Sequence, residues 1–360
     1  MLVTGDEGTG TLAAVRGLRR ARFVPYVAVS RERTYVQWTN AAQEVLRVPD
    51  AKDEPVAHAA AVAQEARRLG VAAVLPGTEG SLRALTGREE LFRGIPVGTS
   101  PPDALERATD KGSLARLSAT AGLESPTTHE VVDGRLPDDI RLPAIVKPVA
   151  SVVPDGDVYR SHEVSRVETP EQFERAVGAG GSWLVQPFVA GRLGAICGVA
   201  WEGRLVCASH QVSPRIWPVE RGISSYAVTV PRDAELEAGV ARLLELVGWS
   251  GVFGVQFIHG RERSYVIDLN PRIYGSTALS IKAGHNLPAI WTELLLGRDP
   301  SVPPYRVGTR YRVEEDDLRA ILKTRDWRGL VPRRNTVWGV FDWRDPKPSL
   351  ESLRKLTPFA

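Results

Sequence analysis

The chain has 360 residues, of which 43% are hydrophobic and 25% are charged, a balance that is ordinary for a soluble globular protein. This length exceeds the usual size of one domain, so we expect two or three domains with separate cores. The formal net charge is only +3, and the arginines are scattered along the chain rather than clustered in a stripe. The sequence therefore gives no support to a nucleic-acid-binding protein.

Membrane and secreted proteins are disfavoured as well. No apolar run approaches the roughly 18 residues of a membrane-spanning helix, and Met1 is followed by "LVTGDEGTG" rather than by a basic and then apolar leader. The two cysteines, Cys197 and Cys207, lack metal-ligand spacing and are expected to be reduced, buried thiols on two strands around a Glu202-Gly203 turn. These features predict a cytoplasmic protein that does not contact membranes.

The first 100 residues alternate between two kinds of pattern. The segments "MLVTG", "FVPYVAVS" and "VAAVLPG" are predicted strands, and "TLAAVRGLRRA" and "PVAHAAAVAQEARRLG" are predicted helices. Such alternation is typical of a parallel sheet that helices cover on both faces, so we expect a doubly wound α/β domain over residues 1–100.

A glycine-rich stretch, "GDEGTGT" from Gly5 to Thr11, resembles a phosphate-binding loop only superficially. Thr11 stands where a P-loop places its lysine. The stretch therefore favours a tight strand-to-helix turn over a nucleotide site, although a helix N-terminus here would still suit a substrate carboxylate.

Two helical segments follow in "GTSPPDALERATDKGSLARLSATAGL", and from "LPAIVKPV" onward the pattern becomes α+β. The chain has seven lysines and 39 arginines, so each lysine is informative. Lys147 stands at the end of an apolar strand, and Lys111 lies in the first turn of a helix, where a cation is mildly unfavourable by itself. A bound polyphosphate would remove that conflict; solvated surface lysines are the alternative.

The segment "GVFGVQFIHGRERSYVIDLNPR" predicts two strands around a polar turn. A turn centred on Glu262 places Gln256 opposite Asp268, and Asn270 shares the face of Asp268 because it follows by two residues. All three side chains offer hard oxygen ligands of the kind that Mg²⁺ prefers, with water and substrate phosphates completing its shell. The alternative is that Asn270-Pro271 merely ends the strand and Asp268 accepts a hydrogen bond there.

These residues carry a resemblance to a known family. The stretch "VQFIHGRERSYVIDLNPR" resembles the metal-binding hairpin of ATP-grasp enzymes, and "DKGSLARL", "PAIVKP" and "LVQPFVAG" precede it in the order of that family. The resemblance covers residues 1–300, and the closing "FDWRDPKPSL" makes the chain most similar to the carboxylate-amine ligase branch.

The resemblance implies an ATP-grasp fold of α/β and α+β parts, in which two α+β lobes hold ATP. The expected divisions are an N-terminal doubly wound domain (1–100), a small lobe with its preceding helices (101–182), a large lobe with the metal site (183–300) and a C-terminal extension packed on the large lobe (301–360).

The resemblance also implies roles for single residues. The expected phosphate contacts are Lys111 and Lys147. The segment expected to read adenine through its backbone is Gln186, Pro187, Phe188 and Val189. The expected magnesium ligands are Gln256, Asp268 and Asn270. Arg272 is expected to face the transferred phosphoryl group and, with Lys147, to act in catalysis. Arg215 is a third catalytic candidate that would bind phosphate or a substrate carboxylate, with surface decoration as the alternative.

Three departures from the family pattern bear on nucleotide binding. Pro187 stands where an acid is common, Leu193 stands near the position of a second acid, and the segment "VASVVPDGDVYRSHEV" replaces a glycine-rich phosphate lid. We therefore expect weaker contacts to the base and sugar than to the triphosphate.

The function implied is an ATP- and Mg²⁺-dependent ligase that activates a small carboxylate as an acyl phosphate and joins it to an amine, releasing ADP and phosphate. Its partners would be small-molecule carboxylate and amine substrates, and a homodimer is left open. One alternative is a nucleotide-binding module with little or no turnover. Another is a bicarbonate-using carboxylase or carbamoyl-type synthetase, which ordinarily belongs to a longer chain with biotin or glutaminase partners.

Overall fold

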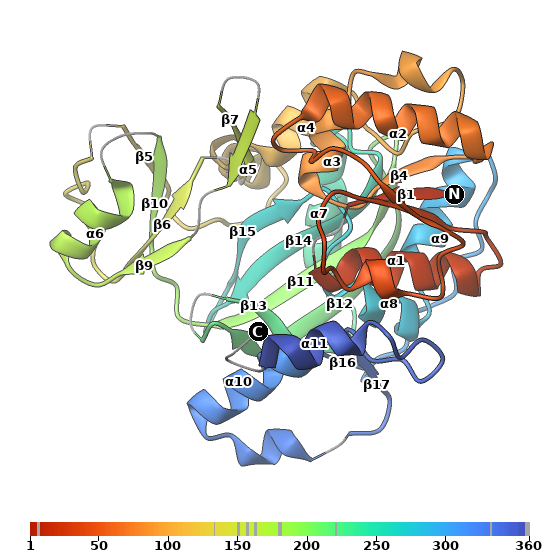
Figure 1. Ribbon diagram of the computed structural model, residues 1–360. Coiled ribbons are helices and arrows are strands. Elements are labelled where there is room, and N and C mark those ends of the chain that lie inside the picture. The colour runs from red at the N-terminus through yellow and green to blue at the C-terminus, as the bar shows by residue number, and fades with distance from the viewer. Residues whose placement is uncertain are drawn as a thin grey trace.

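The computed structural model describes residues 1–5, 8–132, 134–149, 152–155, 158–161, 164–178, 182–219, 222–331 and 333–356. Its strands form a parallel sheet near the N-terminus, a small antiparallel sheet, a large mostly antiparallel sheet and a two-stranded hairpin. The small sheet stands apart at the left of Figure 1, while the parallel sheet and the large sheet lie together.

The N-terminal domain has the predicted parallel sheet. Its strands in spatial order are β3 (Val45–Arg47), β2 (Tyr26–Val29), β1 (Leu2–Thr4) and β4 (Val74–Pro76). Its helices are α1 (Gly8–Arg20), α2 (Pro55–Leu69) and α3 (Glu79–Leu85). Successive residues point to opposite faces: Val3 belongs to one hydrophobic core, and its neighbour Leu2 to another. Both faces of the sheet are therefore buried, as the alternating pattern predicts.

The glycine-rich stretch connects β1, which ends at Thr4, to α1, which begins at Gly8; the expected turn falls on residues 6 and 7, outside the described part of the chain. A Cβ on Gly10 would lie 2.7 Å from the carbonyl oxygen of Tyr274, so the glycine lets the start of α1 approach the segment that follows residue 270. The Thr9 hydroxyl donates to the Gly275 carbonyl at 2.9 Å in the same place. The glycines therefore serve packing at this junction.

The small lobe follows two helices, α4 (Pro102–Thr109) and α5 (Lys111–Thr120). Its antiparallel sheet has the order β5 (His129–Val131), β10 (Trp183–Pro187), β6 (Ala144–Pro148) and β9 (Ser165–Val167). Helix α6 (Pro170–Val177) packs on this sheet, and Phe173 from it joins a separate core with Val146 and Val185. The hairpin β7 (Val152–Asp155) and β8 (Val158–Ser161) occupies the place of the expected lid.

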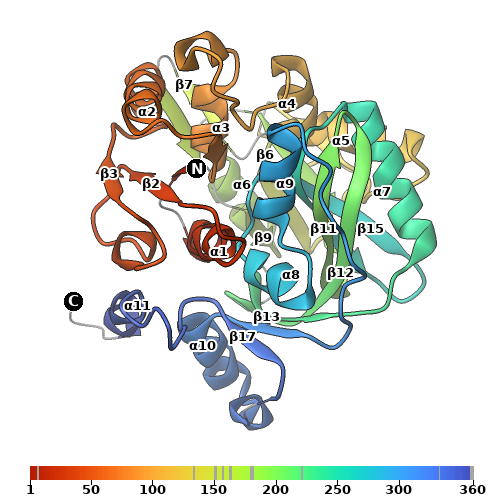
Figure 2. The same cartoon turned by 90° about the vertical axis from the view of Figure 1, so that its right-hand side faces the viewer.

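The large lobe is built on a seven-stranded sheet. In spatial order its strands are β15 (Ser264–Asn270), β14 (Gly251–His259), β11 (Arg192–Trp201), β12 (Arg204–Trp217), β13 (Ile223–Thr229), β16 (Arg310–Arg312) and β17 (Thr336–Trp338). Helix α7 (Ala234–Val247) packs against Ile196 on one face, while α9 (Leu287–Leu295) packs against Cys197 on the other. Figure 2 shows α7 on one side of the strands and α8 (Thr277–Ala283) with α9 on the opposite side.

The hairpin of β11 and β12 confirms the expected turn and thiols. Glu202 and Gly203 both have positive φ angles, 49° and 76°, as a tight two-residue hairpin turn requires. Cys197 and Cys207 are buried and free, and burial raises the pKa of each thiol to about 12. Such thiols are poor nucleophiles.

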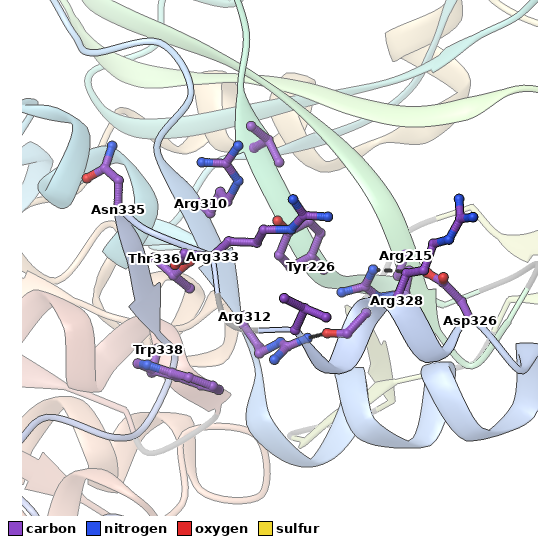
Figure 3. Close-up of a pocket in the computed structure, with 13 residues that line it drawn as sticks. Arg215, Tyr226, Arg310, Arg312, Asp326, Arg328, Arg333, Asn335, Thr336 and Trp338 are labelled. Atoms are coloured by element: carbon purple, nitrogen blue, oxygen red, sulfur yellow. Dashed lines mark hydrogen bonds and ion pairs between the residues drawn. The ribbon is translucent and has the colours of Figure 1, made fainter.

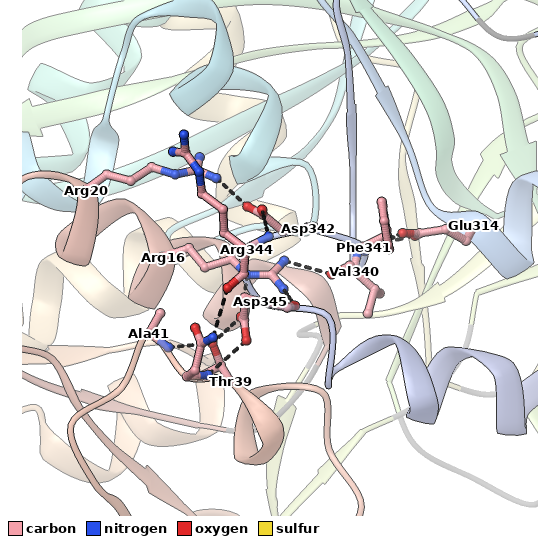
Figure 4. A network of polar contacts seen from close by, with 11 residues as sticks. Arg16, Arg20, Thr39, Ala41, Glu314, Val340, Phe341, Asp342, Arg344 and Asp345 are labelled. Carbon is pink, nitrogen blue, oxygen red and sulfur yellow. Dashed lines mark hydrogen bonds and ion pairs between the residues drawn. The ribbon is translucent and has the colours of Figure 1, made fainter.

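The chain after residue 300 does more than pack on the large lobe. It supplies β16, α10 (Glu314–Thr324), the 3₁₀ helix η3 (Trp327–Leu330), β17 and α11 (Ser349–Leu356). Its closing segment also contacts the N-terminal domain, as Figure 4 shows: the Arg16 guanidinium donates to the Asp345 carboxylate at 2.8 Å and to the Val340 carbonyl at 2.8 Å. The motif "FDWRD" therefore fastens the extension to α1, which the sequence alone did not indicate.

Among the helices that the structure describes, none combines the length and the apolar character that crossing a bilayer requires.

Candidate active site

The centre of the site is the pairing of β14 with β15. Gln256 lies directly opposite Asp268, as the turn predicts, and Gly254 lies opposite Asn270. The register shifts next to this pair, because Phe257 is opposite Val266, which leaves Ile267 as the extra residue of a β-bulge. Next to the turn, the residue pairs are therefore shifted by one position from those that a turn centred on Glu262 predicts. Beyond the bulge, at Gln256 and Asp268, the predicted pairs are present.

Two adjoining cavities meet at this hairpin. The first has a volume of about 260 Å³ and is lined in part by Asp268, by Lys111 and Lys147, and by the end of β10 with the two residues that follow it. The second, of about 140 Å³, is lined in part by Asn270 and Arg272. Gln256 lines both, as do Leu193 and Ile223. We call them the nucleotide cavity and the substrate cavity.

Lys147 reaches the hairpin from the small lobe. It leaves β6 near the end of the strand, only 5% of its surface is exposed, and its ammonium donates to the carbonyl of the bulge residue Ile267 at 3.0 Å. Burial lowers the pKa of Lys147 to about 8, with a smaller lowering from Lys111 and an opposing effect of Asp268. A buried cation with so little compensation is suited to an anionic ligand.

Lys111 is the first residue of α5 and is 7% exposed. The preceding Asp110 caps the helix by accepting from the amides of Gly112 and Ser113 at 2.9 and 3.2 Å. The Lys111 amide itself donates to the Val149 carbonyl at 3.0 Å. The cap and this bond fix the helix start, so the second lysine is held beside the end of the Lys147 strand.

The segment expected to read adenine also lines the nucleotide cavity. Its members there are Gln186, Pro187, Phe188 and Val189. The Gln186 amide donates to the Thr128 hydroxyl at 2.6 Å, and the Phe188 backbone amide donates to the Pro143 carbonyl at 3.0 Å. The Phe188 amide is therefore engaged within the protein, and backbone reading of a base would fall to the other groups of this segment.

Arg215 does not join these residues. Its guanidinium donates to both carboxylate oxygens of Asp317, at 2.6 and 3.0 Å, and to Asp326 at 3.3 Å. It lines a different cavity, formed largely by the C-terminal extension. The sequence suggested a catalytic role for Arg215 because the pairing of the strands around it could not be predicted. Its acidic partners lie about a hundred positions further along the chain.

His210 is held in a structural contact. Its Nε2 lies 3.0 Å from the Glu237 carboxylate of α7, and its ring stacks on Tyr305 with 6.5 Å between centroids. It lines neither the nucleotide cavity nor the substrate cavity.

The substrate cavity contains groups that the sequence did not single out. Gln211 and Ser276 line it and are hydrogen-bonded to each other, with 2.9 Å between Nε2 and the hydroxyl oxygen. Tyr274 and Cys197 also line it. Nothing local in the sequence marks these residues, because they come together only when α8 packs against β12.

The donor set at the hairpin fits magnesium held jointly with a nucleotide. Gln256, Asp268 and Asn270 supply one carboxylate and two amide oxygens, which is too little charge and too few ligands for a magnesium site made by protein alone. Consistently, no group of three or more His, Cys, Asp or Glu side chains suited to a metal is found in the described part of the chain. The buried lysines beside the hairpin are what a phosphate-bearing co-ligand would require.

Part of the chain matches a known family in sequence. Residues 181–317 match the family model described as "ATP-grasp in the biosynthetic pathway with Ter operon", a match that spans most of the large lobe. No curated protein matches the chain in sequence.

The fold of the chain resembles those of several solved structures. One is an L-amino acid ligase from Bacillus licheniformis (17% identity, TM-score 0.63, covering 82% of this chain and 73% of that one). A second is N5-carboxyaminoimidazole ribonucleotide synthetase from Thermus thermophilus (19%, 0.61, 86% and 81%). A third is the biotin carboxylase domain of Hydrogenobacter thermophilus 2-oxoglutarate carboxylase, solved with MgADP, ADP and bicarbonate (14%, 0.65, 86% and 72%).

These matches confirm the resemblance inferred from the sequence. The chain has the ATP-grasp fold, and its large lobe carries the sequence pattern of an ATP-grasp family. At sequence identities of 19% or less, these structures support the assignment of the fold but do not identify the substrates of this chain.

Proposed function

We propose that this protein is an ATP- and Mg²⁺-dependent ligase that phosphorylates a small carboxylate and joins it to an amine. The observation that carries the proposal is the convergence of Gln256 and Asp268, paired across β14 and β15, with the buried lysines Lys111 and Lys147 in one cavity. Two cations and two oxygen ligands in one cavity, with Asn270 in the adjoining cavity, match the needs of a magnesium-bound triphosphate.

The residues divide the work between the two cavities. Lys111 and Lys147 would hold the phosphates, and Gln256, Asp268 and Asn270 would hold the magnesium. Magnesium, when bound, would neutralise charge on the phosphate oxygens. Arg272 lines the substrate cavity beside Asn270, where its planar guanidinium suits a carboxylate or the phosphoryl group that the carboxylate receives.

The proposed reaction has two steps, a phosphoryl transfer to the carboxylate and an acyl transfer to the amine. A carboxylate oxygen attacks the terminal phosphorus of ATP, the bond to the bridging oxygen breaks, and ADP leaves. The amine nitrogen then attacks the acyl carbon, phosphate leaves with the bonding electrons, and the nitrogen loses a proton to solvent or to the departing phosphate. The protein contributes alignment and charge stabilisation and forms no covalent bond with the substrate.

The size of the substrate cavity favours a small carboxylate. Its volume is about 140 Å³, and its lining includes the hydroxyls of Ser213 and Ser276 and the amide of Gln211. A small polar acid such as an amino acid would find hydrogen-bond partners there, whereas a long acyl chain would not fit.

A binding module with little turnover is the second candidate. Its support is the apolar character of the nucleotide cavity at Pro187 and Leu193, where acids that help to hold the base or sugar would be expected. The retained metal ligands and Arg272 favour the enzyme.

The test is a screen for ADP release over pairs of amino acids, other small carboxylates and amines, with mass spectrometry of the products. We expect release that requires both a carboxylate and an amine, together with a condensed product. Binding of MgATP without release for any pair would replace the ligase by the binding module. Release that needs bicarbonate alone would instead indicate a carboxylase or carbamoyl-type synthetase.

A further inference from the structure

A cavity of about 550 Å³ lies away from the nucleotide cavity. It is bordered by β12, β13, β16, β17 and residues 326–331 and 333–335, some of them in η3. Figure 3 shows the side chains that line it, with arginines entering from several of these elements. We call it the arginine cavity. A volume of this size is typical of a small-molecule site.

Stacked rings and guanidinium groups form one wall of the arginine cavity. The Arg215 guanidinium lies 4.3 Å from the centroid of the Tyr226 ring, and Arg312 lies 5.9 Å from Tyr226 and 5.4 Å from Trp338. Arg215 and Arg312 share the buried carboxylate of Asp317 from α10. These contacts fix both guanidinium groups, so a ligand would meet a wall that is already ordered.

Three further arginines line the cavity and have no acidic partner among the residues that the structure describes. Arg310 donates to the backbone carbonyls of Gly308 and Arg334, at 2.9 and 3.3 Å. Arg328 and Arg333 have no ion pair among the described residues. Asp326 is the acidic residue of the lining, and with Asp317 it sets two negative charges against five guanidinium groups. The cavity therefore carries a formal charge of +3.

Clustered cations of this kind repel one another unless an anion joins them. Three unpaired guanidinium groups come from β16, η3 and the segment before β17, so their donors converge from different walls. Guanidinium forks match the oxygens of phosphate and carboxylate groups, and charge-assisted bonds of this type are about twice as strong as neutral ones. Arg328 and Arg333 are exposed, so the cavity is open to an incoming ligand. A surface used only for solubility would not need the ordered aromatic wall of Tyr226 and Trp338.

We infer that the arginine cavity binds a small, multiply charged oxyanion, a molecule carrying two or more phosphate or carboxylate groups. The site is separate from the catalytic one: the arginine cavity shares no lining residue with the nucleotide or substrate cavity. The two regions are nevertheless joined by β13, whose Ile223 and Ser224 line the substrate cavity and whose Tyr226 and Val228 line the arginine cavity. The inference does not depend on the proposed ligase activity.

Calorimetric titration of the whole protein tests the inference, with pyrophosphate as the phosphate probe and citrate as the carboxylate probe. The titrations use a Lys111→Gln/Lys147→Gln background, which removes the phosphate-binding lysines of the nucleotide cavity. The test variants are Arg310→Gln and Arg333→Gln. The matched control is Arg334→Gln, because Arg334 is the exposed neighbour of Arg333 and does not line the cavity.

We expect saturable binding of one probe molecule per chain, weakened roughly 10-fold or more by each test variant and unchanged by the control. The tighter of the two probes identifies the ligand as a phosphate or a carboxylate. Equal losses of probe affinity in Arg334→Gln and Arg333→Gln would show that binding depends only on general surface charge. That result would overturn the inference of a specific site. Absence of binding by both probes, or binding only of an acidic peptide or of RNA, would overturn the small-molecule inference.

Discussion

Gln256 and Asp268 face each other across β14 and β15 even though the two strands slip by one residue immediately beside them. The slip is absorbed by Ile267, whose carbonyl then accepts the hydrogen bond of Lys147 from the opposite lobe. The bulge thus keeps the two proposed metal ligands in register and also supplies an acceptor that positions Lys147, which we propose binds phosphate. β-Bulges are frequent beside functional sites for this reason.

Replacing Asp268 by Asn tests the metal assignment. The change keeps the shape of the side chain but removes the one carboxylate of the proposed ligand set, so magnesium should bind more weakly. We expect ADP release to fall on the order of 10²-fold or more, with partial recovery at high Mg²⁺ and near-normal thermal melting. Glu262→Gln, at the exposed turn of the same hairpin, is the control and should retain activity. An Asp268→Asn enzyme with wild-type turnover would show that Asp268 only ends the strand.

The pH dependence of ATP binding tests the role of Lys147. Its pKa is lowered to about 8 by burial, so the side chain is protonated below this pH and loses its charge above it. A bound phosphate favours the protonated form of Lys147. The dissociation constant of ATP, measured without magnesium, should therefore rise between about pH 8 and pH 9.5, by up to roughly tenfold for each pH unit. Lys147→Gln should bind weakly and lack this dependence. A flat profile in the unmodified protein would remove Lys147 from the phosphate site.

Purine selectivity tests the apolar end of the nucleotide cavity. Pro187 and Leu193 line it where acids would help to hold the base or sugar, so most of the affinity should come from the triphosphate. We expect turnover with GTP to stay within about tenfold of turnover with ATP, because losing one good hydrogen bond to the base costs about that much. A strong preference for ATP would mean that other groups of the segment 186–189 recognise adenine.

Two neighbouring ion pairs between α1 and the closing segment should differ in their contribution to stability. The Arg16–Asp345 pair is buried, and Asp345 also accepts from the Asn40 amide at 2.9 Å. Removing one partner leaves a buried charge, so Arg16→Ala should cost about 3–5 kcal/mol in the free energy of unfolding. The Arg20–Asp342 pair is more exposed, and Arg20→Ala should cost less than about 1 kcal/mol. Urea unfolding of both variants measures the difference; equal losses would contradict the role given to burial.

The sequence was informative where a local pattern determined the geometry. Alternating strands and helices predicted the N-terminal sheet. A turn centred on Glu262 predicted the pairing of Gln256 with Asp268, and the pairing is present, but it depends on the bulge at Ile267, which the sequence did not reveal. The strand β3 was missed because only one of its three residues, Leu46, is buried, whereas the equally short β1 and β4 are fully buried and stand out as apolar runs. Contacts between distant segments were also missed: the ion pair of Arg215 with Asp317 and that of Arg16 with Asp345 join positions about 100 and 330 residues apart. Such pairs depend on tertiary packing, which a single sequence does not reveal.

The N-terminal sheet and the large sheet contribute to the same hydrophobic core, in which Val3 and Val27 pack with Cys197 and Val252. The small lobe keeps a core of its own around Phe173. Since shared cores resist relative movement and separate cores permit it, we expect the two sheets with the shared core to move together as a base and the small lobe to move relative to them as an arm. The base carries the proposed metal ligands and the substrate cavity, and the arm carries Lys147. Each cycle of nucleotide exchange would then require the arm to swing away, breaking the hydrogen bond from Lys147 to the Ile267 carbonyl and remaking it on closure.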